Sequence, residues 1–302
     1  MKKLITFCFS IVYIVLFAQC NINEEQPVNK TISYPLYGIT VDDSWQGADK
    51  LMQIIEAIRA LDVKPTVRIV MSNEMPIEDY VDIFRRIHEV AYVLAQPVDS
   101  YYMRNYTSVD AYRRRFLSAY EKLAIHVDMW EIANEINGEG WLGDNRQFNA
   151  DKMYAAYKLI HDKGAKTVLV SYEVEPEGQE MTMLDWLQKY VPADMKENLD
   201  YLMVSYYEDD HYGYQPDWKS VFENLETMFP NTMMAIGECG NTAKNATVES
   251  KIKMAHYYYT MPKYTKNFVG GYFWWNWVRD CVPHQNNPVW MEINKSMTEI
   301  KW

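Results

Sequence analysis

The chain has 302 residues, of which 48% are hydrophobic and 24% are charged, as in an ordinary globular protein. This length allows two domains or one large barrel. Lys and Arg number 30 against 41 Asp and Glu, the net charge is −11, and no basic run is longer than Arg113–Arg115. Such an acidic chain is a poor candidate for binding nucleic acid. The aromatic fraction is high, at 15%, and aromatic rings both fill cores and form flat platforms for ligands.

The first segment is typical of a targeting signal. Lys2 and Lys3 precede an apolar run that ends at Ala18. Because a comfortable membrane span needs about 20 apolar residues, we interpret residues 1–19 as a secretory signal peptide. The polar stretch 20–33 then predicts a flexible tether. Cys20 at its start resembles the lipidated cysteine of a bacterial lipoprotein, and the acidic pair at 24–25 resembles the surface-export signals of Bacteroidetes lipoproteins.

This resemblance implies a cell-envelope protein that is lipid-anchored through Cys20 at the outer membrane or cell surface. Phe17 and Gln19 depart from the usual residues before that cysteine. A periplasmic or secreted protein and an uncleaved anchor therefore stay open as alternatives. Beyond the signal only Cys239 and Cys281 remain, at no metal-ligand spacing, so a structural zinc site is not expected. We expect two free buried thiols, with a disulfide as the alternative, in a monomer that uses no metal and no cofactor.

From residue 34 onward, short β-rich runs alternate with amphipathic helical runs. Helical period is clear in the stripes of apolar residues within 51–61 and 77–87, and Asn149 is expected to cap a helix that ends at Gly164. The strand candidates are mostly continuous apolar runs, as in parallel sheets buried on both faces. They are 34–41, 65–71, 90–97, 127–134, 166–172, 199–207, 233–238 and 268–277.

Eight such units predict a single (β/α)8 TIM barrel, an α/β fold, over residues 34–302. An open, doubly wound sheet is the alternative. No linker rich in Pro, Gly or Ser and no shift of composition divides this part of the chain. In barrels of this kind the active site lies at the C-terminal ends of the strands, so catalytic residues are sought there.

Two glutamates stand at the ends of the fourth and seventh predicted strands. Glu135 stands in Asn134-Glu135, and Glu238 stands in Gly237-Glu238. Hydrolysis of a glycoside with retention needs two carboxyl groups roughly 5–5.5 Å apart, one as acid/base and one as nucleophile. With Glu238 ionised nearby, Glu135 should keep its proton to a higher pH, since two close negative charges repel each other. The mouth of a barrel can hold such a pair.

These motifs resemble those of the clan A retaining glycoside hydrolases, which include many cellulases, mannanases, galactanases and xylanases. The resemblance implies Glu135 as the acid/base and Glu238 as the nucleophile. It further implies that Asn134 binds a sugar hydroxyl and that Arg68, on the second predicted strand, supports the nucleophile. In the eighth strand Trp275 matches the floor of the reacting subsite, with Trp277 as a second choice.

The sixth predicted strand departs from the better-known pattern of that clan. Many members carry His-x-Tyr, whereas this chain has Ser205-Tyr206-Tyr207, which is similar to the Ser-x-Tyr of the galactanases. Tyr207 stands at the tyrosine position, although the sequence does not settle which of the two tyrosines faces the site. Further aromatic residues follow strand ends and are candidates for stacking sugar rings: Trp45, Trp141, Tyr212 and Tyr214.

The sequence offers little support for a nucleotide-binding protein or a metal-dependent hydrolase. Residues 138–143 fit G-x-G-x-x-G, but no helix starts directly there, which disfavours a nucleotide site. A metal-dependent hydrolase would need a cluster of His and Asp at the strand ends, and no partner His stands at the end of the first predicted strand. EDTA would abolish hydrolysis by such an enzyme. We therefore expect a retaining, endo-acting β-glycosidase for polysaccharide degradation, with carbohydrate as its partner. A non-catalytic carbohydrate-binding barrel and a transglycosylase that uses the same glutamates stay as alternatives.

Overall fold

The computed structural model describes residues 32–42, 47–138, 140–174 and 180–299. Eight parallel strands form one closed barrel in sequence order, with β8 paired to β1. The predicted single (β/α)8 barrel is confirmed, and the open sheet is excluded. The strands are β1 (Leu36–Val41), β2 (Thr66–Val70), β3 (Tyr92–Gln96), β4 (Met129–Ala133), β5 (Thr167–Tyr172), β6 (Tyr201–Ser205), β7 (Met233–Glu238) and β8 (Phe268–Trp274).

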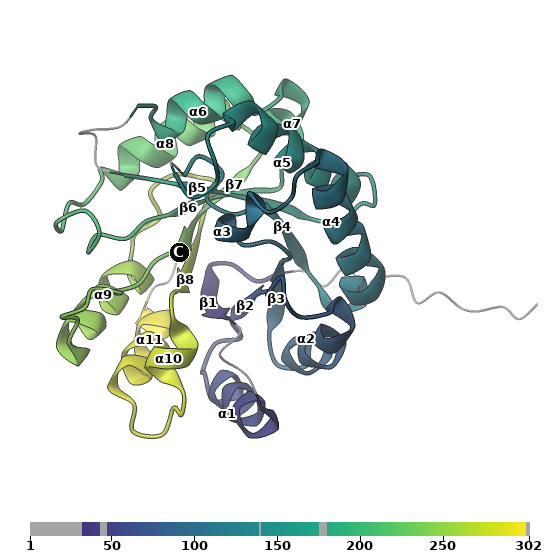
Figure 1. The fold of residues 1–302 in the computed structure, drawn as a ribbon. Helices are drawn as coiled ribbons and strands as arrows, with labels where there is room; N and C mark the ends of the chain where they lie inside the picture. Colours follow the sequence, from purple (N-terminus) through teal and green to yellow (C-terminus); the bar gives the residue numbers. More distant parts are fainter. Residues whose placement is uncertain (1–31, 43–46, 139, 175–179, 300–302) are drawn as a thin grey trace, which may run out of the picture.

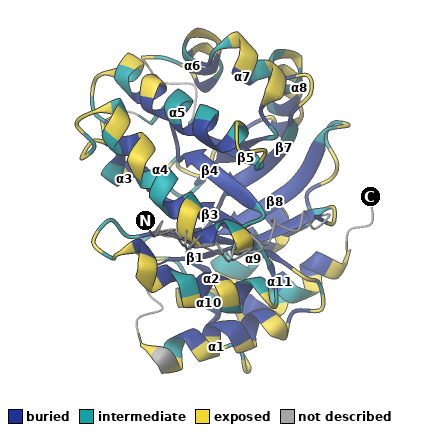
Figure 2. Ribbon diagram, turned by 90° about the vertical axis from the view of Figure 1, so that its right-hand side faces the viewer, coloured by how far each residue is buried: buried dark blue, intermediate teal, exposed yellow. Residues whose placement is uncertain are grey.

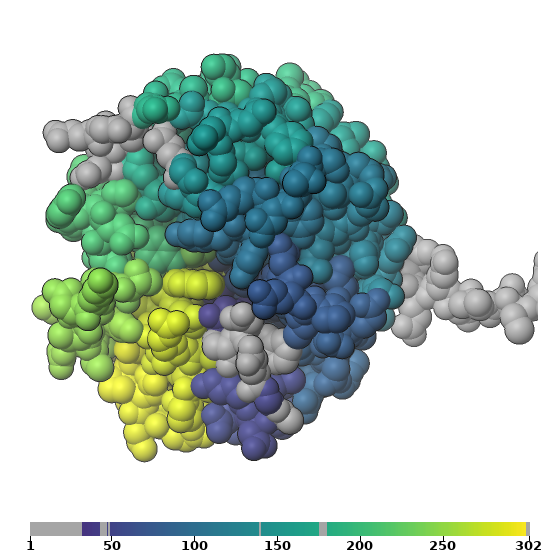
Figure 3. Space-filling view, viewed as in Figure 1, coloured from purple at the N-terminus to yellow at the C-terminus, as the bar shows by residue number. Residues whose placement is uncertain are grey.

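Helices surround the barrel, and Figure 1 shows them as a ring around the central strands. The first half of the described chain contains α1 (Ala48–Arg59), η2 (Ile77–Tyr80), α2 (Val81–His88), α3 (Ser100–Met103), α4 (Val109–Leu123), η3 (Ala124–His126) and α5 (Arg146–His161). The second half contains α6 (Met183–Tyr190), α7 (Ala193–Asn198), α8 (Trp218–Met228), α9 (Val248–Tyr259), α10 (Trp277–Cys281) and α11 (Pro288–Glu299). The early and late parts of the chain lie side by side on the surface in Figure 3, as closure of β8 onto β1 requires.

The strands are apolar throughout because both of their faces are buried. Figure 2 shows them dark blue, inside helices whose outer faces are exposed. Side chains that point outward from the strands form one large cluster with the helices. A second cluster, which includes Leu94, Met129, Met203 and Phe273, comes almost entirely from the strands. We infer that this second cluster fills the lower interior of the barrel, since strand side chains alternate between its two faces.

The start of α5 differs from the sequence-based expectation. Asn145, not Asn149, caps this helix, and its side chain accepts a hydrogen bond from the Phe148 amide. Asn149 lies one turn inside the helix, is buried, and donates to the carbonyls of Leu142 and Gly143. Both asparagines are followed by helix-forming sequence, so the sequence pattern did not distinguish the true capping residue, Asn145, from Asn149. The helix ends at His161, three residues before Gly164.

Two further expectations concern cysteines and membranes. Cys239 and Cys281 are free and buried, so the predicted thiols are confirmed. Within the described residues, no helix combines the length and the apolar character that a bilayer span requires. Cys20 and the signal segment lie outside the described residues.

Candidate active site

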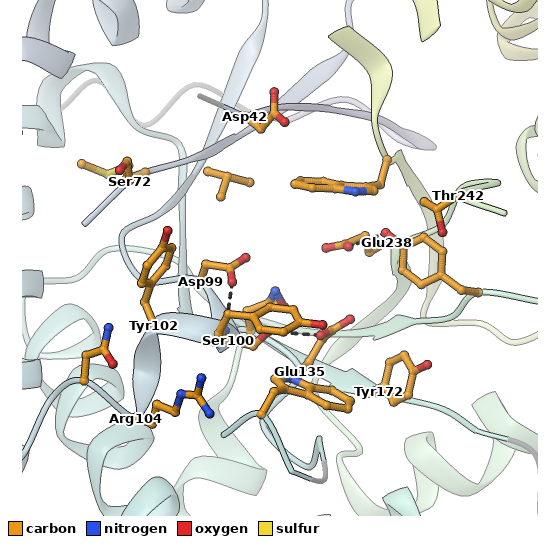
Figure 4. Close-up of a pocket in the computed structure, with 18 of the residues that line it drawn as sticks. Asp42, Ser72, Asp99, Ser100, Tyr102, Arg104, Glu135, Tyr172, Glu238 and Thr242 are labelled. Carbon is orange, nitrogen blue, oxygen red and sulfur yellow. Dashed lines mark hydrogen bonds between the residues drawn. The ribbon is translucent and has the colours of Figure 1, made fainter. Parts of the chain in front are cut away.

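A cavity of about 820 Å³ opens at the C-terminal ends of the strands. Residues at the end of each of the eight strands, or just after it, contribute to the cavity, so it occupies the mouth of the barrel. Figure 4 shows Glu135, Glu238 and Asp99 directed toward this common space. The lining residues are Asp42, Val70, Met71, Ser72, Asp99, Ser100, Tyr101, Tyr102, Arg104, Asn105, Asn134, Glu135, Trp141, Tyr172, Tyr207, Asp210, Glu238, Thr242 and Trp275.

Glu135 lies just past β4 in a sparsely populated backbone conformation. Its φ is 45°, a left-handed value that residues other than glycine seldom adopt, and such strain is frequent at functional sites. Two buried hydroxyls donate to its carboxyl group, Ser205 Oγ to Oε1 at 2.7 Å and Ser100 Oγ to Oε2 at 3.2 Å. Burial, followed by the negative charge of Glu238, raises the pKa of Glu135 to about 8. At neutral pH this carboxyl group therefore keeps its proton.

Glu238, the last residue of β7, has a different environment. The Arg68 guanidinium donates to its Oε2, and the Tyr207 hydroxyl donates to Oε1 at 2.5 Å. Both carboxylate oxygens are thus held by donors, one of which carries a positive charge. The neighbouring chain is packed closely, since a Cβ at Gly240 would lie 1.8 Å from the carbonyl oxygen of Trp275. Glycine at this position lets the segment after Glu238 pass against the end of β8.

Arg68 is fully buried and connects two carboxylates. It makes a bidentate pair with Glu131 of β4, from Nε at 2.7 Å and from Nη2 at 2.9 Å, in addition to its bond with Glu238. A buried arginine beside two carboxylates stays charged, and the Glu131 and Glu238 charges raise its pKa against the effect of burial. Arg68 is absent from the cavity lining. It therefore lies beneath Glu238 as its support, rather than in contact with the open space.

The structure brings several other expected residues to the cavity. Asn134 is buried, and its Oδ1 has no hydrogen-bond partner among the described residues. Tyr207, Trp275 and Trp141 also line the cavity. Trp45 lies outside the described residues.

The structure separates the remaining aromatic candidates from the cavity lining. Trp277 is fully buried in the core at the start of α10. Tyr206 is also buried, and its hydroxyl donates to the Tyr214 carbonyl, so Tyr207 is the tyrosine of this strand end that faces the site. Neither Tyr212 nor Tyr214 belongs to the cavity lining, and Tyr212 is 97% exposed.

Sequence reasoning missed the segment 99–105, which follows β3. Six of its residues line the cavity, and Ser100 contacts Glu135. No motif marks this segment, although its position after a predicted strand was a signal that could have found it. Ser205 was noted only as a departure from the histidine pattern, yet its hydroxyl contacts the same carboxyl group.

Among the described residues, no three His, Cys, Asp or Glu side chains are grouped so that they could hold a metal ion. What these residues offer chemically is a carboxyl group that keeps its proton, a carboxylate held by a guanidinium and a hydroxyl, and aromatic faces beside both.

No family model matches the chain, and no curated protein matches it. Solved structures do resemble its fold. Gas2p of Saccharomyces cerevisiae, in complex with laminaritriose and laminaritetraose, has a TM-score of 0.58 at 14% identity, over 88% of this chain and 64% of that chain. A GH128 (subgroup I) endo-β-1,3-glucanase from Amycolatopsis mediterranei, in complex with laminaritriose, has a TM-score of 0.51 at 8% identity, over 86% and 98% of the two chains.

A β-glucosidase from Thermotoga maritima, in complex with noeuromycin, has a TM-score of 0.52 at 13% identity. The match covers 82% of this chain and 89% of that chain. This chain spans less than two thirds of the length of the yeast protein. At identities this low, the likeness establishes the (β/α)8 fold alone.

Proposed function

We propose that the protein is a retaining glycoside hydrolase that cleaves β-glycosidic bonds in a polysaccharide or oligosaccharide by double displacement. The observation that carries this proposal is the pair Glu135 and Glu238, two buried carboxyl groups in one cavity with opposite environments. One keeps a proton at neutral pH, and the other is held by a guanidinium and a phenol. Glycosidic hydrolysis with retention needs this division of roles.

In the first step Glu238 attacks the anomeric carbon while Glu135 gives its proton to the leaving oxygen. Forming the covalent intermediate removes the negative charge of Glu238. Because that charge raises the pKa of Glu135, the pKa falls in the intermediate. Glu135 then accepts a proton from the water that attacks in the second step, and Glu238 leaves as a carboxylate. The same coupling thus serves both halves of the reaction.

The remaining residues of the cavity support a carbohydrate substrate. The unpartnered Oδ1 of Asn134 is a buried acceptor that a sugar hydroxyl can satisfy. Trp275 and Trp141 offer apolar faces of the kind that sugar rings stack on. Two of the three similar structures were solved with laminari-oligosaccharides. A cavity of about 820 Å³ has room for sugar rings on both sides of the cleaved bond, and we propose endo action on a longer chain.

The first test compares the protein lacking residues 1–19 with its Glu238→Ala variant on β-linked polysaccharides, laminarin included. Loss of a covalent nucleophile should lower sugar release by at least about 10³-fold. Added azide should restore turnover by the variant and yield a glycosyl azide of inverted configuration, because the small anion takes the place of the lost carboxylate. Glu173→Ala is the control, since Glu173 is a half-buried glutamate that directly follows β5 but does not line the cavity. It should keep full activity.

Sugar release that survives Glu238→Ala would contradict the two-glutamate mechanism. Tight binding of a glycan by the wild type without any release would favour the non-catalytic carbohydrate-binding barrel. Products longer than the substrate would instead identify a transglycosylase, which uses the same covalent intermediate.

We further propose that the protein is anchored to the cell envelope through a lipid on Cys20. Support comes from the sequence alone, from the apolar run that ends just before this cysteine. Cells that express the wild type should incorporate labelled palmitate into the protein, and Cys20→Ala should abolish the label. An unlabelled wild type would contradict the anchor and favour simple secretion.

A further inference from the structure

The segment 99–105 forms one wall of the cavity, and Ser100 within it donates a hydrogen bond to Glu135. The Asp99 side chain caps α3 by accepting a hydrogen bond from the Tyr101 amide at 2.9 Å. At the other end of α3, Lys152 Nζ donates to the Met103 carbonyl at 3.0 Å. The segment is therefore fixed at both ends by buried or half-buried polar groups.

This wall borders the place of the leaving group. In a barrel of eight strands, β3 is the neighbour of β4 and lies across the mouth from β7. The wall is accordingly beside Glu135 and opposite Glu238, and Figure 4 shows Arg104 beyond Glu135 on the side away from Glu238. Since Glu135 is proposed to protonate the oxygen of the leaving sugar, a leaving sugar on the Glu135 side of the mouth would contact this wall.

Arg104 gives the wall a positive charge in a cavity whose other described charged residues are acidic. Five carboxyl groups line the cavity, Asp42, Asp99, Glu135, Asp210 and Glu238. Of the described lining residues, only Arg104 is a lysine or arginine. Arg104 is exposed and forms no ion pair or side-chain hydrogen bond within the described part of the chain.

An aromatic pair lines the same cavity as Arg104. Tyr101 is 63% exposed and is stacked on Trp141, with ring centroids 6.2 Å apart and an angle of 23° between the planes. Trp141 in turn packs edge-on against Tyr172 at 5.5 Å. Aromatic rings that line one cavity with an unpaired arginine can hold the apolar face of a sugar ring while the guanidinium binds an anion on it.

We propose that this wall is a leaving-group subsite for an anionic sugar, such as a hexuronate or a sulfated hexose, whose anionic group binds Arg104. The inference rests on the proposed glycosidase function and names its substrate class. Guanidinium groups bind carboxylate and sulfate oxygens through paired, charge-assisted hydrogen bonds. At the reacting position Glu238 repels an anion, and the Arg68 that supports it does not line the cavity. The anionic unit is therefore accepted on the leaving-group side and disfavoured at the reacting position.

Binding is tested with β-linked acidic oligosaccharides, from hyaluronan and from mannuronan, and with the same oligosaccharides after carboxyl reduction. Reduction removes the charge but keeps the linkage. Titration calorimetry uses Glu135→Gln as the background in every protein, so that no turnover occurs. We expect the acidic form of at least one oligosaccharide to bind about tenfold more tightly than its reduced form. Arg104→Gln should abolish this preference, and Arg104→Lys should restore part of it.

Arg113→Gln is the matched control, because Arg113 on α4 is also exposed and unpaired within the described residues but does not line the cavity. It should keep the preference. Equal affinity for acidic and reduced forms, a preference that survives Arg104→Gln, or no binding of any acidic oligosaccharide would each overturn the subsite. Hydrolysis is measured separately with wild-type Glu135. An Arg104-dependent preference without hydrolysis of any glycan would contradict the glycosidase, and hydrolysis of neutral glycans alone would contradict the subsite.

Discussion

The carboxyl group of Glu135 is under opposing influences that can be separated by substitution. Burial and the charge of Glu238 raise its pKa to about 8, whereas the hydrogen bond from Ser205 lowers it. Ser100 donates to the other oxygen. A hydroxyl that donates a hydrogen bond to a carboxyl group stabilises its ionised form, and both serines donate to Glu135. The two serines therefore favour the form that Glu135 needs as a base in the second step.

Removal of this support predicts a shift in the pH profile. Ser205→Ala should raise the pKa of Glu135, so the alkaline limb of kcat/KM, where the acid loses its proton, should move to higher pH. The hydrolysis of the covalent intermediate needs the ionised form and should slow by about tenfold, since hydrogen bonds to charged groups contribute about 1.5–3 kcal/mol. An aryl glycoside with a good leaving group makes that second step rate-limiting, and its kcat measured against pH reports the change.

Ser171→Ala provides the control for this experiment. Ser171 is also a fully buried strand serine, but its hydroxyl contacts Met183 Sδ and the Met203 carbonyl rather than Glu135. Its profile should match that of the wild type. A Ser205→Ala profile with unmoved limbs would assign the serine to packing alone.

The raised pKa of Glu135 also predicts how stability depends on pH. The unfolded chain ionises this group near 4.5 and the folded protein near 8, so between these values the folded state binds more protons. The contribution of this group to the free energy of unfolding is therefore complete below pH 4.5 and is lost as the pH rises toward 8. Glu135→Gln should resist urea better than the wild type at pH 8, and the difference should shrink at pH 4.5. A difference that does not change with pH would contradict the raised pKa.

At the scale of elements, α3 depends on α5 for its position. It is only four residues long, and the Met103 carbonyl at its end accepts from Lys152 Nζ, a lysine that is almost completely buried. Lys152→Met should leave this carbonyl unsatisfied and lower the unfolding free energy by about 1–3 kcal/mol. It should also raise KM, because the wall 99–105 loses an anchor. Urea denaturation and steady-state kinetics measure the two effects.

Lys158→Met on the same helix is the control, because it removes a lysine charge without removing a buried hydrogen bond. Lys158 forms an exposed ion pair with Asp162, and exposed pairs contribute little to stability. Its loss should leave KM unchanged. If both variants were equally stable with the same KM, the proposed anchoring of α3 would be wrong.

The elements differed in how well the sequence predicted them. All eight strands were predicted, because strands buried on both faces are continuous apolar runs. Glu135 and Glu238 were identified because they stand at the ends of such strands. The short helix α3 has no apolar period and no motif, so its part in the cavity depends on tertiary contacts that a sequence does not display. Trp275 and Trp277 are two residues apart in one aromatic run, yet only Trp275 faces the cavity. Their difference depends on where β8 ends and α10 begins.

At the scale of the whole molecule, the barrel has an apolar floor and a polar mouth. Leu94, Met129 and Met203 belong to the interior cluster. Above them Arg68 joins β2 to Glu131 on β4 and to Glu238 on β7. One buried cation thus connects three strands that are far apart in sequence. Its removal leaves carboxylates buried without their partner, which is far more costly than the loss of an exposed pair.

Arg68→Met should therefore lower the unfolding free energy by about 3–5 kcal/mol and abolish activity. Arg68→Met combined with Glu131→Met removes both members of the buried pair, and methionines of similar volume should recover much of the lost stability. Activity should not return in the double variant, because Glu238 keeps only the Tyr207 hydroxyl as a donor. Urea denaturation and glycan hydrolysis together measure this separation. A double variant as unstable as Arg68→Met would mean that Arg68 stabilises the barrel mainly by packing, and a double variant with restored activity would show that Glu238 reacts without its guanidinium partner.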